Sequence, residues 1–228
     1  MANSYKRIDA HLSSLGYCTR SEAKKFLKIF EVFVKDKRVF DVSLKANHED
    51  IFINNEPLDA QTITILLNKP SGYICSHNDA GSLIYSLLPE RWNRRNPKIS
   101  TVGRLDVDTT GAIILTDNGD LNHKLTSPKS DVIKVYEATL AEPLKGDEAQ
   151  IFASGELMLN GEKKPLLPAM LEIISPTLVR LEIVEGKYHQ VKRMFAAVGN
   201  RVIKLHRVSF AGFQIDDLKE GEYKFIEL

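Results

Sequence analysis

Apolar residues near the N-terminus recur at helical spacing. Ile8, Leu12 and Leu15 lie on one face of a predicted helix. A second stripe occupies positions i, i+3, i+4 and i+7 and consists of Ala23, Phe26, Leu27 and Phe30. Thr19 and Glu22 precede this stripe with the spacing of a capping box. The pattern therefore predicts two short helices in succession.

The pattern then changes to short apolar runs. Residues 32–34 and 51–53 are such runs and predict strands. The apolar pattern is interrupted near Leu58 to Thr62. We therefore expect a small α/β domain over residues 1–60 and a second domain over residues 61–228.

The second domain contains many runs of strand length and few helical patterns. The predicted strands are 63–67, 112–115, 132–140, 169–174 and 178–184. A short helix is expected over 121–125. A further helix is indicated by a core stripe with a C-terminal glycine, namely Val191, Met194, Phe195, Val198 and Gly199. This mixture favours an α+β domain whose mixed, mainly antiparallel sheet is flanked by helices.

Composition changes this picture little. The 228 residues are 43% hydrophobic and 27% charged, with a formal net charge of +1, as in globular proteins of one large or two modest domains. Two cysteines, Cys18 and Cys75, and the lack of an apolar stretch near ~18 residues favour a reduced, cytoplasmic setting without a membrane span.

Charge distribution is more informative than net charge. Residues 187–207 contain six basic residues and no acid, and residues 91–104 contain five basic residues and no acid. One such run alone is more often a solvated helix face. Two in one chain favour a polyanionic partner.

A glycine-bounded loop, Thr101 to Gly111, places Asp106 immediately before an apolar strand. Arg104 would share a side with Asp106 in an extended segment and favour its ionised form. An ionised aspartate can act as a nucleophile or a base. The alternative for an aspartate near glycine is a turn residue. An EF-hand-like spacing in the same loop lacks flanking helices and a final glutamate, which argues against calcium.

The sequence Gly-Arg-Leu-Asp-Val-Asp-Thr-Thr-Gly, with the following Thr116-Asp117-Asn118-Gly119-Asp120, resembles the catalytic loop of the RsuA-type pseudouridine synthases. That family carries G-R-L-D-x-D-T-x-G-L-x-x-x-T-x-D-G there. Asn68 to Tyr73 resembles the N-K-P-x-G-x turn of these enzymes, and Lys134-x-Tyr136 resembles their K-x-Y element. Glu185 to Gly199 is similar to the element whose basic residue, here Lys192, pairs with the catalytic aspartate.

The N-terminal part resembles the S4-type RNA-binding domain of the same family. Residues 5–9 and 19–23 are similar to its R-L-D and S-R-x-x-A signatures. The resemblance implies catalytic roles for Asp106, Arg104, Tyr136 and Lys192. It implies RNA contacts for Arg20, Lys24, Lys28, Lys69, His189, Gln190 and Arg193.

The reaction that the resemblance implies is the isomerisation of uridine to pseudouridine in ribosomal RNA, without metal, redox or nucleotide cofactor. The wording around residues 188–195 and 205–207 is nearer the small-subunit (16S) branch than the large-subunit branches. Partners would be ribosomal RNA or a small-subunit assembly intermediate, and we expect a monomer.

Two alternatives from other classes remain. A noncatalytic RNA-binding assembly factor could keep the fold, although it would not need Asp106, Tyr136 and Lys192. A metal-dependent nuclease could use Asp106, Asp108, Asp117 and Asp120. The segment from Asp117 to Asp120 is explained more simply as a turn that caps the helix after it.

Overall fold

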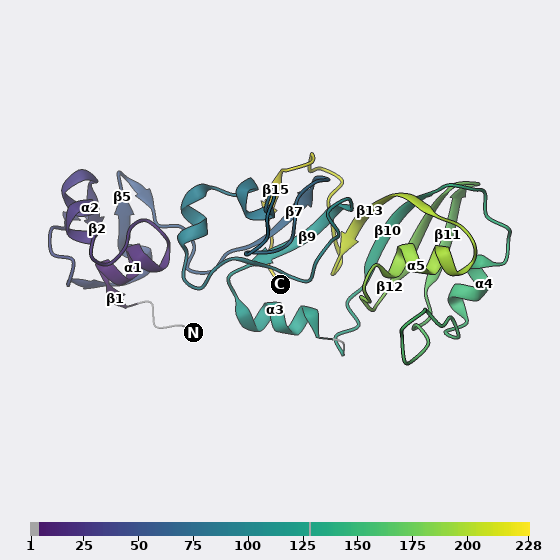
Figure 1. Ribbon diagram of the computed structural model, residues 1–228. Coiled ribbons are helices and arrows are strands. Elements are labelled where there is room, and N and C mark those ends of the chain that lie inside the picture. The colour runs from purple at the N-terminus through teal and green to yellow at the C-terminus, as the bar shows by residue number, and fades with distance from the viewer. Residues whose placement is uncertain (1–4, 128) are drawn as a thin grey trace. The chain divides into compact units, whose positions relative to one another are not determined.

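The computed structural model describes residues 5–127 and 129–228 and divides into two compact units (Figure 1). Unit 1 comprises the chain through Ile63 together with Leu88–Ser100 and Thr116–Gly119. Unit 2 comprises Thr64–Leu87, Thr101–Leu115 and Asp120–Leu228. The two compact units are therefore not separated by a single boundary near residue 60, because two later segments of the chain pack with the N-terminal residues.

The described residues of unit 1 form two α-helices and two small sheets. Its elements are β1 (Lys6–Arg7), α1 (Ile8–Ser14), α2 (Ala23–Ile29), β2 (Val32–Val34), β3 (Lys37–Arg38), β4 (Lys45–Ala46), β5 (Ile51–Ile53) and β6 (Glu56–Pro57), with short 3-10 helices at His48–Asp50 and Glu90–Arg94. An antiparallel sheet has the order β3-β2-β5-β6, and β1 pairs with β4. Ile8, Leu12 and Leu27 pack with the strands in one core.

The predicted hydrogen bonding between Thr19 and Glu22 is present, but α2 begins only at Ala23, with Glu22 as its N-cap, and not directly after Thr19. The backbone N–H and hydroxyl of Thr19 donate to a carboxylate oxygen of Glu22 at 2.9 and 2.7 Å. Ala23 and Leu27 are buried, whereas Phe30 at the end of the stripe is 37% exposed. The helix ends at Ile29, so Phe30 is its C-cap and only the first part of the stripe faces the core.

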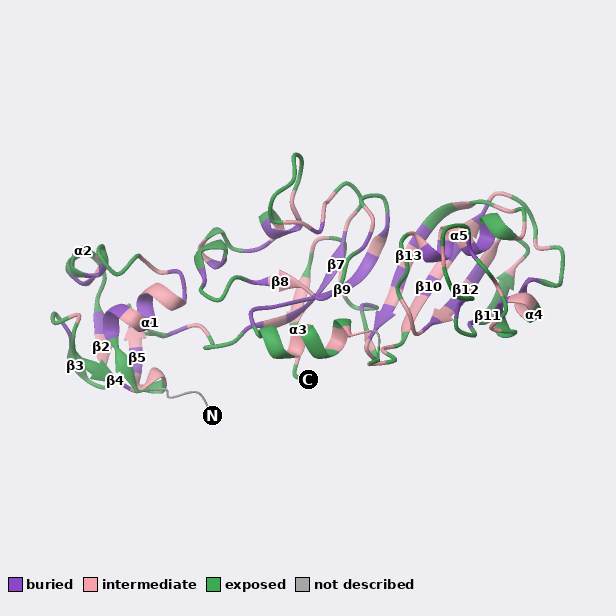
Figure 2. Cartoon of the chain, turned by 60° about the horizontal axis from the view of Figure 1, so that its bottom comes forward, coloured by how far each residue is buried: buried purple, intermediate pink, exposed green. Residues whose placement is uncertain are grey.

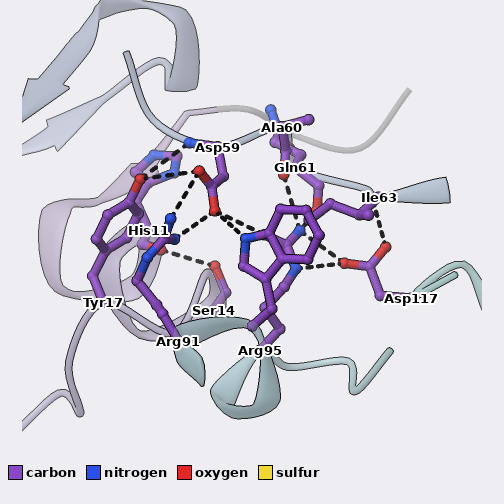
Figure 3. Close-up of polar contacts among 11 residues, drawn as sticks. His11, Ser14, Tyr17, Asp59, Ala60, Gln61, Ile63, Arg91, Arg95 and Asp117 are labelled. Atoms are coloured by element: carbon purple, nitrogen blue, oxygen red, sulfur yellow. Dashed lines mark hydrogen bonds and ion pairs between the residues drawn. The ribbon is translucent and has the colours of Figure 1, made fainter. Parts of the chain in front are cut away.

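A polar network holds residues 59–63 against the segment 88–100 within unit 1 (Figure 3). The carboxylate of Asp59 accepts hydrogen bonds from the guanidinium of Arg91 and, at 2.9 Å, from the indole N–H of Trp92. The Arg91 guanidinium lies 4.1 Å from the ring centre of Tyr17. The residues that join the two expected domains are therefore fixed by charge-assisted hydrogen bonds.

A second, more deeply buried pair belongs to the same network. Arg95 is 2% exposed and donates to the Asp117 carboxylate at 2.8 Å and to the backbone carbonyls of Ala60 and Gln61 at 2.9 and 3.0 Å. The other Asp117 oxygen accepts the backbone N–H of Ile63 at 2.7 Å. Asp117 is thus committed to holding the chain, which counts against its use as a metal ligand with Asp106.

Unit 2 is built on a large mixed sheet. Its strands are β7 (Thr64–Lys69), β8 (Ser100–Thr101), β9 (Thr110–Thr116), β10 (Lys134–Leu140), β11 (Met170–Ser175), β12 (Leu178–Ile183), β13 (Val202–Phe210), β14 (Phe213–Gln214) and β15 (Tyr223–Phe225). The order is β11-β12-β10-β13-β9-β7-β15, with β14 beside β13 and β8 beside β9. The β9–β13 pair is parallel, and the pairs of β10 with its neighbours β12 and β13 are antiparallel. The expected mixed, mainly antiparallel sheet with few helices is confirmed.

Helices cover this sheet. They are α3 (Gly119–Thr126), α4 (Glu148–Ala153) and α5 (Gln190–Ala197), with a 3-10 turn at Ile84–Leu87. Helix α4 contacts β11 and α5 contacts β13, and Phe152 of α4 meets Phe195 of α5 edge to face with ring centres 5.2 Å apart. Leu125 of α3 packs against the cluster that contains Ala112 and Ile114. Figure 2 shows β7 and β9 as largely buried strands. No helix among the described residues is long and apolar enough to cross a bilayer.

The junction of β9 and β13 depends on a glycine. Gly111 has φ +107° and lies opposite Arg207, and a Cβ placed on it would be 2.2 Å from the Arg207 carbonyl oxygen. Only glycine allows this close approach of the two backbones. Gly111 thereby brings the end of the Asp106 loop next to Arg207.

Candidate active site

A cleft of about 350 Å³ lies in unit 2, at the small end of the range typical of ligand sites, ~300–1,000 Å³. The loop before β9, strand β10, the turn that leads into α5 and strand β13 line it, together with the end of α3, Leu167 and Ile183 of β12. Asp106, Arg104, Tyr136, His189 and Gln190 are among the lining residues. Segments far apart in sequence therefore meet around Asp106.

Hydrogen bonds from the buried side chain of Lys69 hold the loop that carries Asp106. The Lys69 side chain is fully buried, and its ammonium donates to the backbone carbonyls of Pro70, Val107 and Thr109 at 3.1, 3.2 and 2.8 Å. Burial lowers the pKa of Lys69 from its ordinary value. The expectation that Lys69 contacts RNA is corrected, because its donors are used to fix the loop.

Two nitrogen groups hold the Asp106 carboxylate. One oxygen lies 3.2 Å from His189 Nε2 and the other 3.1 Å from Lys192 Nζ. The Asp106 side chain is 27% exposed, so it is presented to the cleft and not sealed. The predicted pairing of residues 106 and 192 is therefore present.

Lys192 serves two carboxylates. Its Nζ also donates to Asp108 Oδ1 at 2.7 Å. Burial lowers the pKa of Lys192, but hydrogen bonds to Asp108 and Asp106 outweigh it, and the net pKa is raised. The hydrogen bond from Lys192 lowers the pKa of Asp108. Lys192 is therefore a firmly charged cation at the rim of the cleft.

Helix α5 sets the direction of these side chains. Val191, Met194 and Phe195 are buried, as the sequence predicts. His189 precedes the helix with φ +47°, a left-handed conformation that turns its ring toward Asp106. Gln190 is 4% exposed, accepts the Lys187 N–H at 2.8 Å and donates to Glu185 at 3.1 Å. Gln190 therefore holds the turn before α5, which corrects its expected role as an RNA contact.

Arg193 and Arg104 depart from expectation. Arg193 donates to Glu162 at 3.0 Å and to the Asn160 carbonyl at 2.5 Å, so its guanidinium fixes the loop at residues 160–162 and is not free for RNA. Arg104 is exposed and lines the cleft, but among the described residues no ion pair joins it to Asp106. Lys192 contacts Asp106 as expected, and His189 occupies the place expected for Arg104.

Tyr136 on β10 is 8% exposed and lines the cleft. Its hydroxyl accepts a hydrogen bond of 3.3 Å from Arg207. Arg207 also donates from Nε to the Ala112 carbonyl at 2.6 Å and so joins β13 to β9 beside the site. The sequence drew attention to Arg207 as a member of a basic run and of the 205–207 segment, but not as a buried residue of the site, because its burial follows from tertiary structure.

Lys134 lies two residues before Tyr136 and also lines the cleft. Its Nζ donates to the carbonyls of Val132 and Val184 at 2.6 and 3.0 Å. Burial, and then the charge of Arg207, lowers the pKa of Lys134 to about 8. In unit 1, the candidate RNA contacts Arg20, Lys24 and Lys28 are all exposed.

Comparison with known proteins agrees with this site. Residues 63–197 match the model of a family described as RNA pseudouridylate synthase. The chain is 41% identical over 225 residues to the ribosomal small subunit pseudouridine synthase A of Escherichia coli K12, covering 96% of this chain and 95% of that protein. It is 42% identical over 223 residues to the Pasteurella multocida protein of the same name, with 96% and 94% covered. A crystal structure of a pseudouridylate synthase matches with a TM-score of 0.68 and 39% identity, over 97% of this chain and 96% of that one. The chain therefore belongs to the RNA pseudouridylate synthase family.

Proposed function

We propose that the protein converts a uridine of small-subunit (16S) ribosomal RNA to pseudouridine and that Asp106 starts the reaction. The observation that carries this proposal is the Asp106 carboxylate, which faces a cleft while His189 and Lys192 hold its two oxygens. The two relatives named above support the small subunit as the source of the substrate.

The reaction breaks the bond between N1 of the base and C1′ of the sugar and forms a bond between C5 and C1′. A proton leaves C5 and N1 gains one, so atoms and charge balance and no electrons are transferred. Asp106 promotes cleavage of the glycosidic bond, either by attack at the sugar or as a base. Tyr136, which lines the cleft, stacks on the detached base, an interaction worth about 1–3 kcal/mol, and assists loss of the C5 proton.

The target uridine must leave its stack to enter the cleft. Flipping costs a few kcal/mol and costs least in loops and single strands. Basic side chains around the cleft offset this cost through contacts with the RNA backbone. We assign residues 1–60 to an S4-like RNA-binding domain, with Arg20, Lys24 and Lys28 as its phosphate contacts, and residues 61–228 to catalysis.

The choice of RNA is tested with separate 16S and 23S transcripts that carry tritium at C5 of uridine. We expect tritium release from 16S RNA and little from 23S RNA, either as free RNA or after partial assembly with ribosomal proteins. Release from 23S RNA alone would overturn the proposed substrate. Absence of release from both RNAs, despite tight binding, would favour a noncatalytic assembly factor.

A further inference from the structure

One wall of the cleft carries two cations without a carboxylate partner. Arg207 and Lys134 both line the cleft, and no ion pair among the described residues involves either of them. Their charges face the same space and repel each other, since Arg207 is among the causes that lower the pKa of Lys134. Buried charges are normally paired or hydrogen-bonded.

The contacts of Arg207 leave one of its three guanidinium nitrogens without a partner. Its side chain is fixed by the Ala112 carbonyl, the Tyr136 hydroxyl and the Phe210 ring, whose centre lies 4.5 Å from the guanidinium carbon. The residue is 2% exposed, and its Nη2 atom is buried with no hydrogen-bond partner. A buried donor without an acceptor is costly and rare, so each instance calls for an explanation.

Lys134 has the complementary arrangement. Two carbonyls hold its ammonium, which leaves one of its three donors for another acceptor. Its Nζ lies 6.0 Å from the ring centre of Phe210, the same ring that supports Arg207. Both cations therefore lie near one aromatic side chain, and among the described residues neither forms an ion pair with a carboxylate.

We propose that Lys134 and Arg207 form a subsite for a phosphate group of the RNA, the phosphodiester next to the flipped uridine. The inference rests on the proposed function of the cleft as the site that receives this nucleotide. A phosphodiester supplies the missing negative charge and the acceptor oxygens for both residues. Arginine and lysine are the usual partners of phosphate.

A phosphate explains the two charges better than a neutral group does. A uracil carbonyl would satisfy the free Arg207 donor but would leave both charges uncompensated. The flipped nucleotide carries its own phosphodiester into the protein, so no further ligand is required. A phosphate bound to Arg207 would also help to position the active site, because Arg207 donates hydrogen bonds to Tyr136 and to the strand that follows the Asp106 loop.

The test measures the affinity of full-length protein for 16S RNA against salt concentration, in an Asp106→Asn background that prevents turnover. A lost phosphate contact reduces the slope of log affinity against log salt by about 1. We expect this reduction for Lys134→Gln and for Arg207→Gln. Arg207→Lys keeps the charge and should retain the slope, which separates charge from packing if Arg207→Gln folds poorly. Arg180→Gln is the matched control. Arg180 lies on the neighbouring strand β12, and its charge is already paired with Glu137 and Glu172.

A second measurement identifies the phosphate. After the modified uridine is mapped, the phosphodiester on each side of it is replaced in turn by a neutral methylphosphonate. One of the two replacements should weaken RNA binding by a protein with Lys134 intact several-fold. The same replacement should have little further effect on RNA binding by the Lys134→Gln protein. Equal weakening of both proteins, or unchanged salt slopes with lower affinity, would overturn the phosphate subsite and indicate a neutral acceptor. Turnover by Asp106→Asn would instead overturn the proposed function.

Discussion

Lys192 illustrates how much one residue contributes to this site. Its ammonium contacts both Asp106 and Asp108, and among the described residues no second lysine or arginine forms an ion pair with either carboxylate. A charge-assisted hydrogen bond contributes about 1.5–3 kcal/mol. The loss of this cation therefore leaves His189 as the remaining partner of Asp106.

We predict that Lys192→Met lowers the single-turnover rate about 10- to 150-fold, which is the same free energy expressed as a rate. Lys192→Arg should keep most of the activity. The surface pair formed by Lys224 and Asp217 provides the control variant, Lys224→Met, which should behave as wild type. A Lys192→Met protein with full activity would show that Asp106 does not need this partner.

We predict that RNA affinity depends on pH through Lys134. Its pKa of about 8 means that it loses its charge as pH rises from 7 to 9, with Arg207, Glu185 and Asp131 as the charged groups that act on it. RNA affinity of the Asp106→Asn protein should therefore fall over this range, and Lys134→Arg should remove the dependence. Titration by fluorescence anisotropy measures it, and an unchanged profile in Lys134→Arg would assign the effect to another group.

The contribution of Lys134 to folding stability changes with pH in the opposite direction to its contribution to RNA affinity. The unfolded chain holds the Lys134 proton up to about pH 10.5, whereas the folded chain releases it near pH 8. Between these values the unfolded state binds more protons, so the contribution of Lys134 to stability rises with pH. Weaker RNA binding above pH 8 would therefore not result from Lys134 destabilising the fold.

Among the elements, the strands and helix α5 were the most predictable. Apolar periodicity placed β9, β10, β12 and the buried face of α5 because each buries a local, regular pattern. The roles of Lys69, Gln190 and Arg207 were not predictable in this way. Each is a polar residue whose partners lie on other segments, and only the folded chain shows that carbonyls or carboxylates take up its donors.

Gly111 provides a prediction about an element junction. Gly111→Ala should destabilise the protein by more than the ~1–3 kcal/mol typical of backbone strain, because the new Cβ meets the Arg207 backbone as well. Gly146 is the matched control, since its φ of +114° is similar but nothing lies within 4 Å of its Cβ position. Equal losses of unfolding free energy in denaturant titrations would contradict the close β9–β13 contact.

At the scale of the whole molecule, the compact units are not continuous segments of the chain. The sequence placed a boundary near residue 60 because the apolar pattern stops there. It could not reveal that Leu88–Ser100 and Thr116–Gly119 pack with the N-terminal residues, since that association depends on Asp59, Arg95 and Asp117. The family was predictable from the motifs, whereas this interleaving was not.

We predict that a fragment of residues 64–228 loses protection in the segment 88–100. Without residues 59–61, Arg91 and Trp92 lose the Asp59 carboxylate, and Arg95 loses two carbonyl partners. Hydrogen exchange measured by mass spectrometry should show faster exchange in 88–100 and little change in β10–β13. Unchanged exchange in 88–100 would mean that this segment does not depend on the N-terminal residues.

The most direct test of the account compares wild type with Asp106→Asn on C5-tritiated 16S RNA, with RNA binding measured on the same samples. Asp120→Asn, at an exposed position of α3, is the control. We predict tritium release by wild type and Asp120→Asn, none by Asp106→Asn, and similar RNA affinity for all three. Release by Asp106→Asn at about one-tenth of the wild-type rate, a barrier change of only ~1.4 kcal/mol, would contradict the central role of Asp106.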